Sequence, residues 1–182
     1  MNKIYVKHKL KSFIFIYIKI FIMNLKSIID KQIIFDQTLS EAHQIEGKDW
    51  IHKAILALYV EVAELANEIQ SFKYWKKNKN INQDLIKEEY ADGLHFLVSF
   101  LNEFERVDEI EAKIYDQDLN KQFLKMFAAI NLIEQDFTQE NIINAFAIYL
   151  GIAKLLNISD DEIEQAYNHK NEINFQRIKN NY

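Results

Sequence analysis

Apolar residues recur at steps of three and four along most of the chain, and this period constrains the fold more than any other feature. Leu58, Val62 and Leu65, for example, fall on one face of a helix. The chain contains no proline and only three glycines, so it lacks the turn residues that separate short alternating strands. The pattern predicts an all-α fold and argues against sheets.

The same period predicts a bundle of five or six helices. Gly47 interrupts the first helical pattern, and the polar run 76–83 predicts a loop before the third. Thr138 can cap the fifth helix, and Ser159 with Glu162 forms a capping box for the last. The predicted helices span about residues 25–45, 50–73, 84–104, 120–137, 139–156 and 160–179.

Composition narrows the classes of protein that the chain can belong to. Its 182 residues are enough for one domain with a hydrophobic core. The absence of cysteine excludes disulfides, zinc–thiolate sites and thiol catalysis. The net charge of −5 and the lack of a basic stripe argue against nucleic acid as a partner. We expect a cytoplasmic protein, because nothing in the sequence argues for secretion.

The first 22 residues differ from the rest in charge. They hold five lysines and no acid, whereas residues 23–182 carry 17 basic and 27 acidic residues. Lys19 interrupts their apolar run, which is shorter than the ~20 residues of a membrane span. No small-residue cleavage site follows, as one would after a signal peptide. We interpret residues 1–22 as an upstream extension before a natural start at Met23, which opens a single domain 23–182. The alternatives are a membrane-attaching or targeting segment and an extra docking helix.

Two pairs of acids lie at helical spacing in the second and third predicted helices. They are Glu61 with Glu64 and Glu89 with Asp92, each pair at i and i+3. Antiparallel packing of the two helices would bring four carboxylates together. Such a cluster needs a positive partner when it is partly buried. Oxygen ligands alone favour Mg²⁺ or Mn²⁺ over zinc, and ions held in this way suit phosphate chemistry.

A solvated acidic face, paired with lysines, is the alternative explanation for the same spacing. Glu88 lies one residue off the acidic stripe and is expected to face solvent. His95 lies one turn past Asp92 and is expected to be packed, with a supporting role behind the acids as the alternative. Trp50, just after the break at Gly47, is interpreted as a core or dimer contact.

The last predicted helix presents a second polar face. Lys170, Asn174 and Arg177 follow at i, i+4 and i+7, so they share one side of a helix. A lysine and an arginine at this spacing suit the oxygens of a phosphate chain. A solvent-exposed helix at the end of the chain is the alternative. Tyr167 and Asn171, on neighbouring turns, are weaker candidates for ligand contacts.

Three segments resemble the all-α dUTP diphosphatases, a dimeric family related to the MazG-type nucleoside triphosphate pyrophosphatases. They are "KAILALYVEVAELANEIQSFKYWK" (53–76), "EEYADGLHFLVS" (88–99) and "IEQAYNHKNEINFQRIKNNY" (163–182). With the helices between them, the resemblance covers roughly residues 25–182. It implies a helical bundle of the all-α NTP pyrophosphatase type.

The resemblance also implies roles for individual residues. Glu61, Glu64, Glu89 and Asp92 would bind two or more Mg²⁺ ions, with Mn²⁺ as a substitute. Glu61 would in addition orient or deprotonate the attacking water.

Substrate contacts are implied by the same resemblance. Lys170 and Arg177 would bind phosphates, and Asn174 would bind the sugar or the base. Gln37 would read uracil through its amide. Trp75 would stack on the base or close the site, with packing as the alternative. Lys73 would lie near the phosphates.

The activity implied is hydrolysis of dUTP to dUMP and pyrophosphate, which limits uracil in DNA and supplies dUMP for thymidylate synthesis. The family also implies a homodimer formed by the Ile- and Phe-rich outer faces of the helices. Two alternatives stay open. One is an all-α pyrophosphatase that acts on dCTP or a modified dNTP, and the other is a non-catalytic helical interaction protein.

Overall fold

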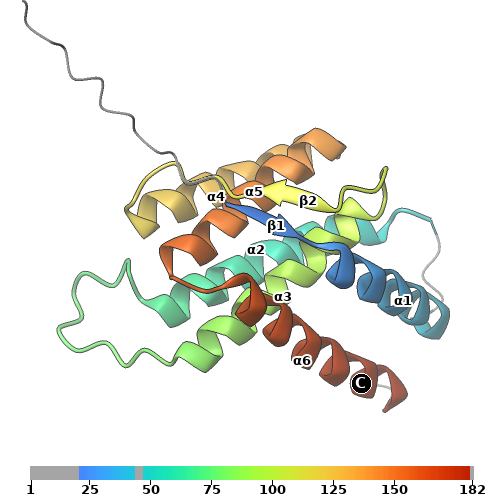
Figure 1. Cartoon of the computed structure of the whole chain (residues 1–182), viewed down its shortest axis with the longest axis horizontal. Helices are drawn as coiled ribbons and strands as arrows, with labels where there is room; N and C mark the ends of the chain where they lie inside the picture. Colours follow the sequence, from blue (N-terminus) through green and yellow to red (C-terminus); the bar gives the residue numbers. More distant parts are fainter. Residues whose placement is uncertain (1–20, 44–46, 181–182) are drawn as a thin grey trace, which may run out of the picture.

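Six α-helices and one short two-stranded sheet make up the described part of the chain, residues 21–43 and 47–180, in a computed structural model (Figure 1). Each of the predicted helices is present, which confirms the all-α fold class. The elements in order are β1 (Ile22–Asn24), α1 (Lys26–His43), α2 (Trp50–Ile69), α3 (Gln83–Leu101), β2 (Glu109–Glu111), α4 (Leu119–Gln135), α5 (Gln139–Leu155) and α6 (Asp160–Lys179).

The predicted caps of the last two helices are confirmed. The Thr138 side chain accepts a hydrogen bond from the backbone N–H of Asn141 at the start of α5. Ser159 and Glu162 form the capping box at the start of α6, each satisfying a backbone N–H of the other. These caps fix where the chain turns into α5 and α6.

The second helix ends earlier than its apolar period predicts. Gln70 takes a left-handed conformation with φ of 58°, and its N–H donates to the carbonyl of Ala66. This cap stops α2 at Ile69, although Phe72 continues the apolar spacing. The third helix begins where Asn82 accepts bonds from two backbone N–H groups of its first turn.

The ribbon of β1 and β2 corrects the expectation that the chain contains no sheet. The strands pair antiparallel, with buried Met23 opposite buried Ile110. Each strand has only three residues, too few to show an alternating pattern. Ile22 belongs to β1, so the sheet crosses the domain boundary predicted at Met23. The rest of the predicted extension or targeting segment, residues 1–20, lies outside the described residues.

The antiparallel pair α2 and α3 carries the acids and lies in the middle of the bundle (Figure 1). Leu58, Val62 and Leu65 of α2 are fully buried, as are Leu94 and Val98 of α3. Burial of each such side chain contributes about 1.5–3 kcal/mol to stability. The other faces of α3 pack against α1, α5 and α6, so a side chain on α3 can meet groups from several elements.

A glycine lets α5 approach α3 closely beside the acids. A Cβ atom at Gly93 would lie 2.4 Å from the hydroxyl of Tyr149. That hydroxyl donates to the carbonyl of Tyr90 at 2.9 Å, and Tyr90 donates back to the carbonyl of Tyr149 at 3.3 Å. These two reciprocal hydrogen bonds fix the position of α3 along α5 next to Asp92.

Several apolar side chains remain on the outer surface of the bundle. Leu56 of α2 and Leu124 of α4 are 65% and 68% exposed. Within the described residues, no single helix is long and apolar enough to cross a membrane. The helices α5 and α6 meet that criterion only as a pair, and they are bent by 111° at the break between them.

Candidate active site

Three of the four predicted acids converge between α2 and α3. Glu61, Glu89 and Asp92 each place a carboxylate oxygen within 4.8 Å of the others. Glu64 is exposed and outside this group, yet it lies close enough for its charge to raise the pKa of Glu61. The spacing argument therefore brings a compact triad together and leaves the fourth acid at its edge.

The triad carries more negative charge than its surroundings balance. Burial raises the pKa of Glu61 to about 7, and repulsion from Asp92 adds to the effect. Burial and the same neighbour raise the pKa of Glu89 to about 7. At neutral pH the cluster therefore holds protons unless a cation takes their place. Three hard oxygen donors in a compact group fit a divalent ion such as Mg²⁺.

Lys170 supplies part of the missing positive charge from α6. Its ammonium lies 2.6 Å from Asp92 and 3.0 Å from Glu88, and the residue is only 6% exposed. Burial lowers the pKa of Lys170, but the bonds to the two carboxylates outweigh it and leave the pKa raised. Glu88 thus holds a lysine, a correction to the expectation that it simply faces solvent. Lys170 lies behind Asp92 and does not line the adjoining pocket.

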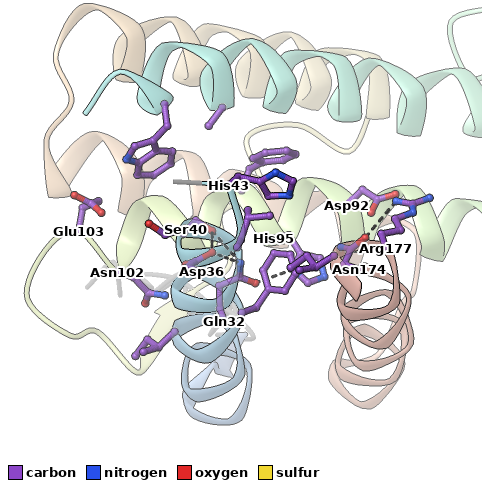
Figure 2. A pocket seen from close by; sticks show the side chains of 18 of the residues that line it. Gln32, Asp36, Ser40, His43, Asp92, His95, Asn102, Glu103, Asn174 and Arg177 are labelled. Carbon is purple, nitrogen blue, oxygen red and sulfur yellow. Dashed lines mark hydrogen bonds between the residues drawn. The ribbon is translucent and has the colours of Figure 1, made fainter. Parts of the chain in front are cut away.

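A pocket of about 690 Å³ opens beside the acids, between α1, the start of α2, α3 and α6. Glu61 and Asp92 belong to its wall, whereas Glu89 does not. Figure 2 shows its labelled side chains in order along its length: Arg177 and Asp92, then His95 and Asp36, then Asn102. The pocket therefore extends from the acids past His95 and Asp36 to the end of α3.

The predicted face of α6 contributes to the acid end of the pocket. Asn174 and Arg177 both line it, and the guanidinium donates to the Asn174 side-chain oxygen at 3.2 Å. The charge of Arg177 also opposes the rise in the pKa of Asp92. The structure therefore brings this cation and amide to the carboxylates, as their spacing on the helix suggested.

Farther along the pocket, a buried amide organises polar groups from three helices. Gln32 of α1 is 1% exposed. Its Nε2 donates to Asp36 at 2.7 Å and to the Ser99 hydroxyl at 2.9 Å. Its Oε1 accepts from the Tyr167 hydroxyl at 2.7 Å and lies 2.7 Å from Nδ1 of His95. Every hydrogen-bonding position of this amide is used inside the protein.

The network decides which nitrogen of His95 carries the proton. The carboxylate of Asp36 holds the NH₂ end of Gln32, so the oxygen end faces the imidazole. An amide oxygen only accepts, and Nδ1 of His95 must therefore be the donor. Burial lowers the pKa of His95 to about 3, so the ring is neutral. Its Nε2 keeps a lone pair that has no partner among the described residues.

Three predicted substrate residues lie away from this pocket. Gln37 is exposed on α1 and donates to Glu41 at 3.0 Å. Trp75 is 62% exposed and packs edge-on against Phe72 and Tyr74 in the loop after α2. The ammonium of Lys73, in the same loop, donates to the Asn67 carbonyl at 3.2 Å. None of the three lines the pocket, and their predicted roles stay predictions.

Other residues line the pocket without having been singled out for it. Trp50, interpreted from sequence as core or dimer contact, forms part of the wall, as do Phe35 and Asp36. Gln32 falls in the apolar stripe that contains Ile28 and Phe35. A polar residue inside such a stripe is the signal that could have identified it. Tyr167 and Asn171 are buried supports of this network.

An all-α protein with a carboxylate cluster at the mouth of a pocket, faced by an arginine, has the site of a hydrolase for phosphorylated ligands. The sequence profile of the dUTPase family matches residues 24–182. The chain belongs to the dUTPase family, and its activity is dUTP hydrolysis. A search among curated proteins finds no match to the chain.

Proposed function

We propose that this chain hydrolyses dUTP to dUMP and pyrophosphate with Mg²⁺ held by Glu61, Glu89 and Asp92, and with Glu64 as a further ligand at the edge. The observation that carries the proposal is the acid triad, whose three carboxylates converge beside a pocket. Burial raises the pKa of all three, to about 7 for Glu61 and Glu89, which supports binding of a cation there. When bound, Mg²⁺ supplies charge neutralisation for the triphosphate and activation of a water. Mn²⁺ fits the same donors.

Glu61 is the acid best placed to act on the attacking water. It belongs both to the triad and to the pocket wall, whereas Glu89 belongs only to the triad. A carboxylate at this position can orient a water and accept its proton as the water attacks phosphorus. No covalent bond between substrate and protein is needed.

Positive charge on the opposite wall binds the phosphate chain. Arg177 has a forked set of donors that matches phosphate oxygens, and Asn174 can turn its amide to the sugar or to the phosphates. Lys170 lies 2.6 Å from Asp92, where it steadies the acid and adds positive potential at the phosphates. These groups offset the negative charge that develops on the leaving pyrophosphate.

The part of the pocket away from the acids suits the uracil ring. Phe35 and Trp50 provide apolar walls, and Asp36 presents a carboxylate whose Oδ1 is fixed by Gln32 and Ser99. The second oxygen of Asp36 can accept a hydrogen bond from N3–H of uracil, a donor that cytosine lacks. We propose Asp36 as a reader of the base, in addition to the untested prediction for Gln37. A role for Trp75 or Lys73 requires their loop to move toward the pocket.

Pyrophosphate release from dUTP, dTTP, dCTP, dATP, dGTP and UTP, with Mg²⁺ or with a chelator, tests this proposal. We expect release from dUTP alone, and none with chelator. Equal release from dCTP would discard the uracil assignment, and release with chelator would discard the metal.

An Asp36→Asn variant tests the base assignment separately. It keeps the oxygen that Gln32 and Ser99 hold and replaces the second oxygen by an NH₂ donor. We expect the preference for dUTP over dCTP to fall at least about tenfold, since a donor opposes N3–H of uracil and suits N3 of cytosine. Gln37→Asn is the matched control and should keep the preference.

We also propose that this activity keeps dUTP scarce, limits uracil in DNA and supplies dUMP for thymidylate synthesis in the cytoplasm. A homodimer is part of the proposal, supported by the apolar side chains exposed on α2 and α4, among them Leu56 and Leu124. Sedimentation equilibrium tests it: a dimer mass is expected, and a Leu124→Glu variant with unchanged mass would exclude this surface.

A further inference from the structure

The pocket wall contains a buried hydrogen-bond acceptor that no described residue satisfies. Nε2 of His95 has no partner among the described residues, although the residue is only 6% exposed and lines the pocket. Its other nitrogen is committed as a donor to Gln32 at 2.7 Å. A buried acceptor without a partner costs free energy, and such a cost is commonly recovered when a ligand donor arrives.

The substrate class limits which donor this can be. Away from its ionised triphosphate, dUTP carries only two hydrogen-bond donors, the N3–H of uracil and the 3′-hydroxyl of deoxyribose. A neutral imidazole with its proton on Nδ1 can only accept at Nε2. His95 can therefore pair with one of these two groups and with no acceptor atom of the nucleotide.

The order of side chains along α3 selects between the two donors. His95 follows Asp92 by three residues, or about 4.5 Å along the helix axis, and Ser99 follows by seven, or about 10.5 Å. Ser99 donates to Asp36 at 2.8 Å, which places that carboxylate at the farther level. In a nucleotide the 3′-hydroxyl lies nearer the phosphates than N3 does. The nearer acceptor thus meets the sugar and the farther one meets the base.

We propose that Nε2 of His95 accepts a hydrogen bond from the 3′-hydroxyl of the bound deoxyribose, which makes His95 a specificity-determining residue for the sugar. This inference rests on the proposed function, because it places the phosphates at Asp92 and the base at Asp36. Gln32 acts through His95 as a positioning residue, since its oxygen fixes the tautomer that leaves Nε2 free to accept.

Access to Nε2 requires a small opening of the wall, because the atom itself exposes almost no surface. The Phe35 ring lies 5.9 Å from the His95 ring and also lines the pocket. On its other side, Phe35 meets Phe175 of α6 edge-on at 5.3 Å. We expect Phe35 to shift when a nucleotide enters, which couples sugar recognition to the packing of α1 against α6.

Two substitutions separate the donor and the acceptor of this imidazole. His95→Asn places an NH₂ near the position of Nδ1, so it can still donate to Gln32, but it has no atom at the position of Nε2. His95→Gln places its polar end near Nε2 and keeps an acceptor there. Asp36→Asn is the matched control for the other donor of the substrate. Thermal melts and circular dichroism establish that each variant is folded.

The experiment measures kcat/KM for dUTP, 2′,3′-dideoxy-UTP and N3-methyl-dUTP, together with calorimetric binding of the corresponding monophosphates. We expect the wild type to prefer dUTP over the dideoxy analogue at least about tenfold. In His95→Asn this ratio should fall to about 1–2, while the preference over the N3-methyl analogue stays unchanged. In His95→Gln part of the sugar preference should remain, and Asp36→Asn should show the reverse pattern.

Two results would overturn the inference while leaving the proposed function intact. One is a His95→Asn protein that keeps the tenfold sugar preference, and the other is a His95→Asn protein that loses the N3-methyl preference instead. If the wild type releases no pyrophosphate from dUTP, the proposed function fails. The binding ratios for dUMP and its dideoxy analogue then decide the inference alone: the same collapse in His95→Asn supports it, and unchanged ratios or no binding overturn it.

Discussion

The two ends of the pocket are both polar and both lie between helices, but they differ in how far their charges and hydrogen bonds are satisfied within the protein. At the acid end, burial and then repulsion from neighbouring carboxylates raise the pKa of Glu61 and of Glu89 to about 7, although Lys170 and Arg177 lie close to the triad. At the network end, Gln32 uses every hydrogen-bonding position within the protein. The acid end therefore needs a cation to balance its charge, whereas the Gln32 amide at the network end is satisfied without a ligand.

This difference assigns separate tasks to the two ends. A group of carboxylates with excess negative charge is stabilised by a cation. The activity and stability that depend on this group should therefore vary with metal and pH. A satisfied network gains nothing from a cation and serves instead to preorganise the pocket wall. Substitutions at the acid end should abolish activity with little loss of stability. Substitutions in the network should mainly cost stability.

The largest expected effect is at the acid end. Glu61→Gln removes a negative charge from the triad and the acid that faces the pocket, so kcat/KM for dUTP should fall about 1,000-fold. The free energy of unfolding without metal should be unchanged or higher, because repulsion is relieved. Glu68→Gln, on the same helix outside the triad, is the control and should stay within about twofold. A Glu61→Gln enzyme with full activity would contradict the assignment of catalysis to the acid end.

The network end gives the next largest effect, on stability. Gln32→Leu strands the His95, Tyr167 and Asp36 groups that this amide satisfies, and should lower the free energy of unfolding by about 3 kcal/mol. Urea denaturation measures it. Gln37→Leu is the matched control on the exposed face of α1 and should change stability by less than about 0.5 kcal/mol. Equal losses in the two variants would show that the network of Gln32 contributes no more to the free energy of unfolding than an exposed glutamine does.

The acid end should contribute to the pH dependence of stability. Folding raises the pKa of Glu61 and Glu89 from 4.5 to about 7, so the folded protein binds more protons between these values. Their contribution is present at low pH and is lost as pH rises through about 7. His95 acts in the opposite direction below pH 6.5, because its folded pKa is about 3.

Comparison of the wild type with Glu61→Gln isolates the acid contribution, since His95 is common to both. In chelator, the melting temperature of the wild type should drop relative to the variant between pH 5.5 and 8. Millimolar Mg²⁺ should raise the wild-type melting temperature at pH 8. A difference between the two proteins that is constant with pH would contradict the account.

The smallest effect concerns which tryptophan senses the nucleotide. Trp50 lines the pocket and Trp75 does not, and the chain has no other tryptophan. The fluorescence change on binding dUMP with Mg²⁺ should therefore persist in Trp75→Phe and vanish in Trp50→Phe. The opposite result would show that the loop after α2 moves to the site, as the sequence pattern of Trp75 suggested.

Much of the fold follows from local sequence signals. The period of three and four located all six helices, and the caps at Thr138 and Ser159 fixed two of their starts. The ribbon of β1 and β2 could not be foreseen, since two three-residue strands leave no periodic pattern and pair across more than 80 residues.

The candidate site also has a part that the sequence predicts and a part that it does not. Spacing on one helix put Glu61 beside the α3 acids, because adjacent antiparallel helices have few ways to pack. The family resemblance named Gln37 and did not identify Gln32, whose position in the network depends on which face of α1 meets α3. Nor could it show that Lys170 would point behind Asp92 instead of into the pocket. The packing of three helices against one another decides where these side chains point, and residue spacing within a single helix carries no information about that packing.

The central claim is that the two ends of one pocket bind the two halves of one nucleotide. A crystal structure with Mg²⁺ and the non-hydrolysable α,β-imido analogue of dUTP tests it most directly. We predict metal at Glu61, Glu89 and Asp92, phosphates at Arg177 and uracil beside Asp36. A nucleotide bound elsewhere, or one whose base lies at the acid end, would contradict the account.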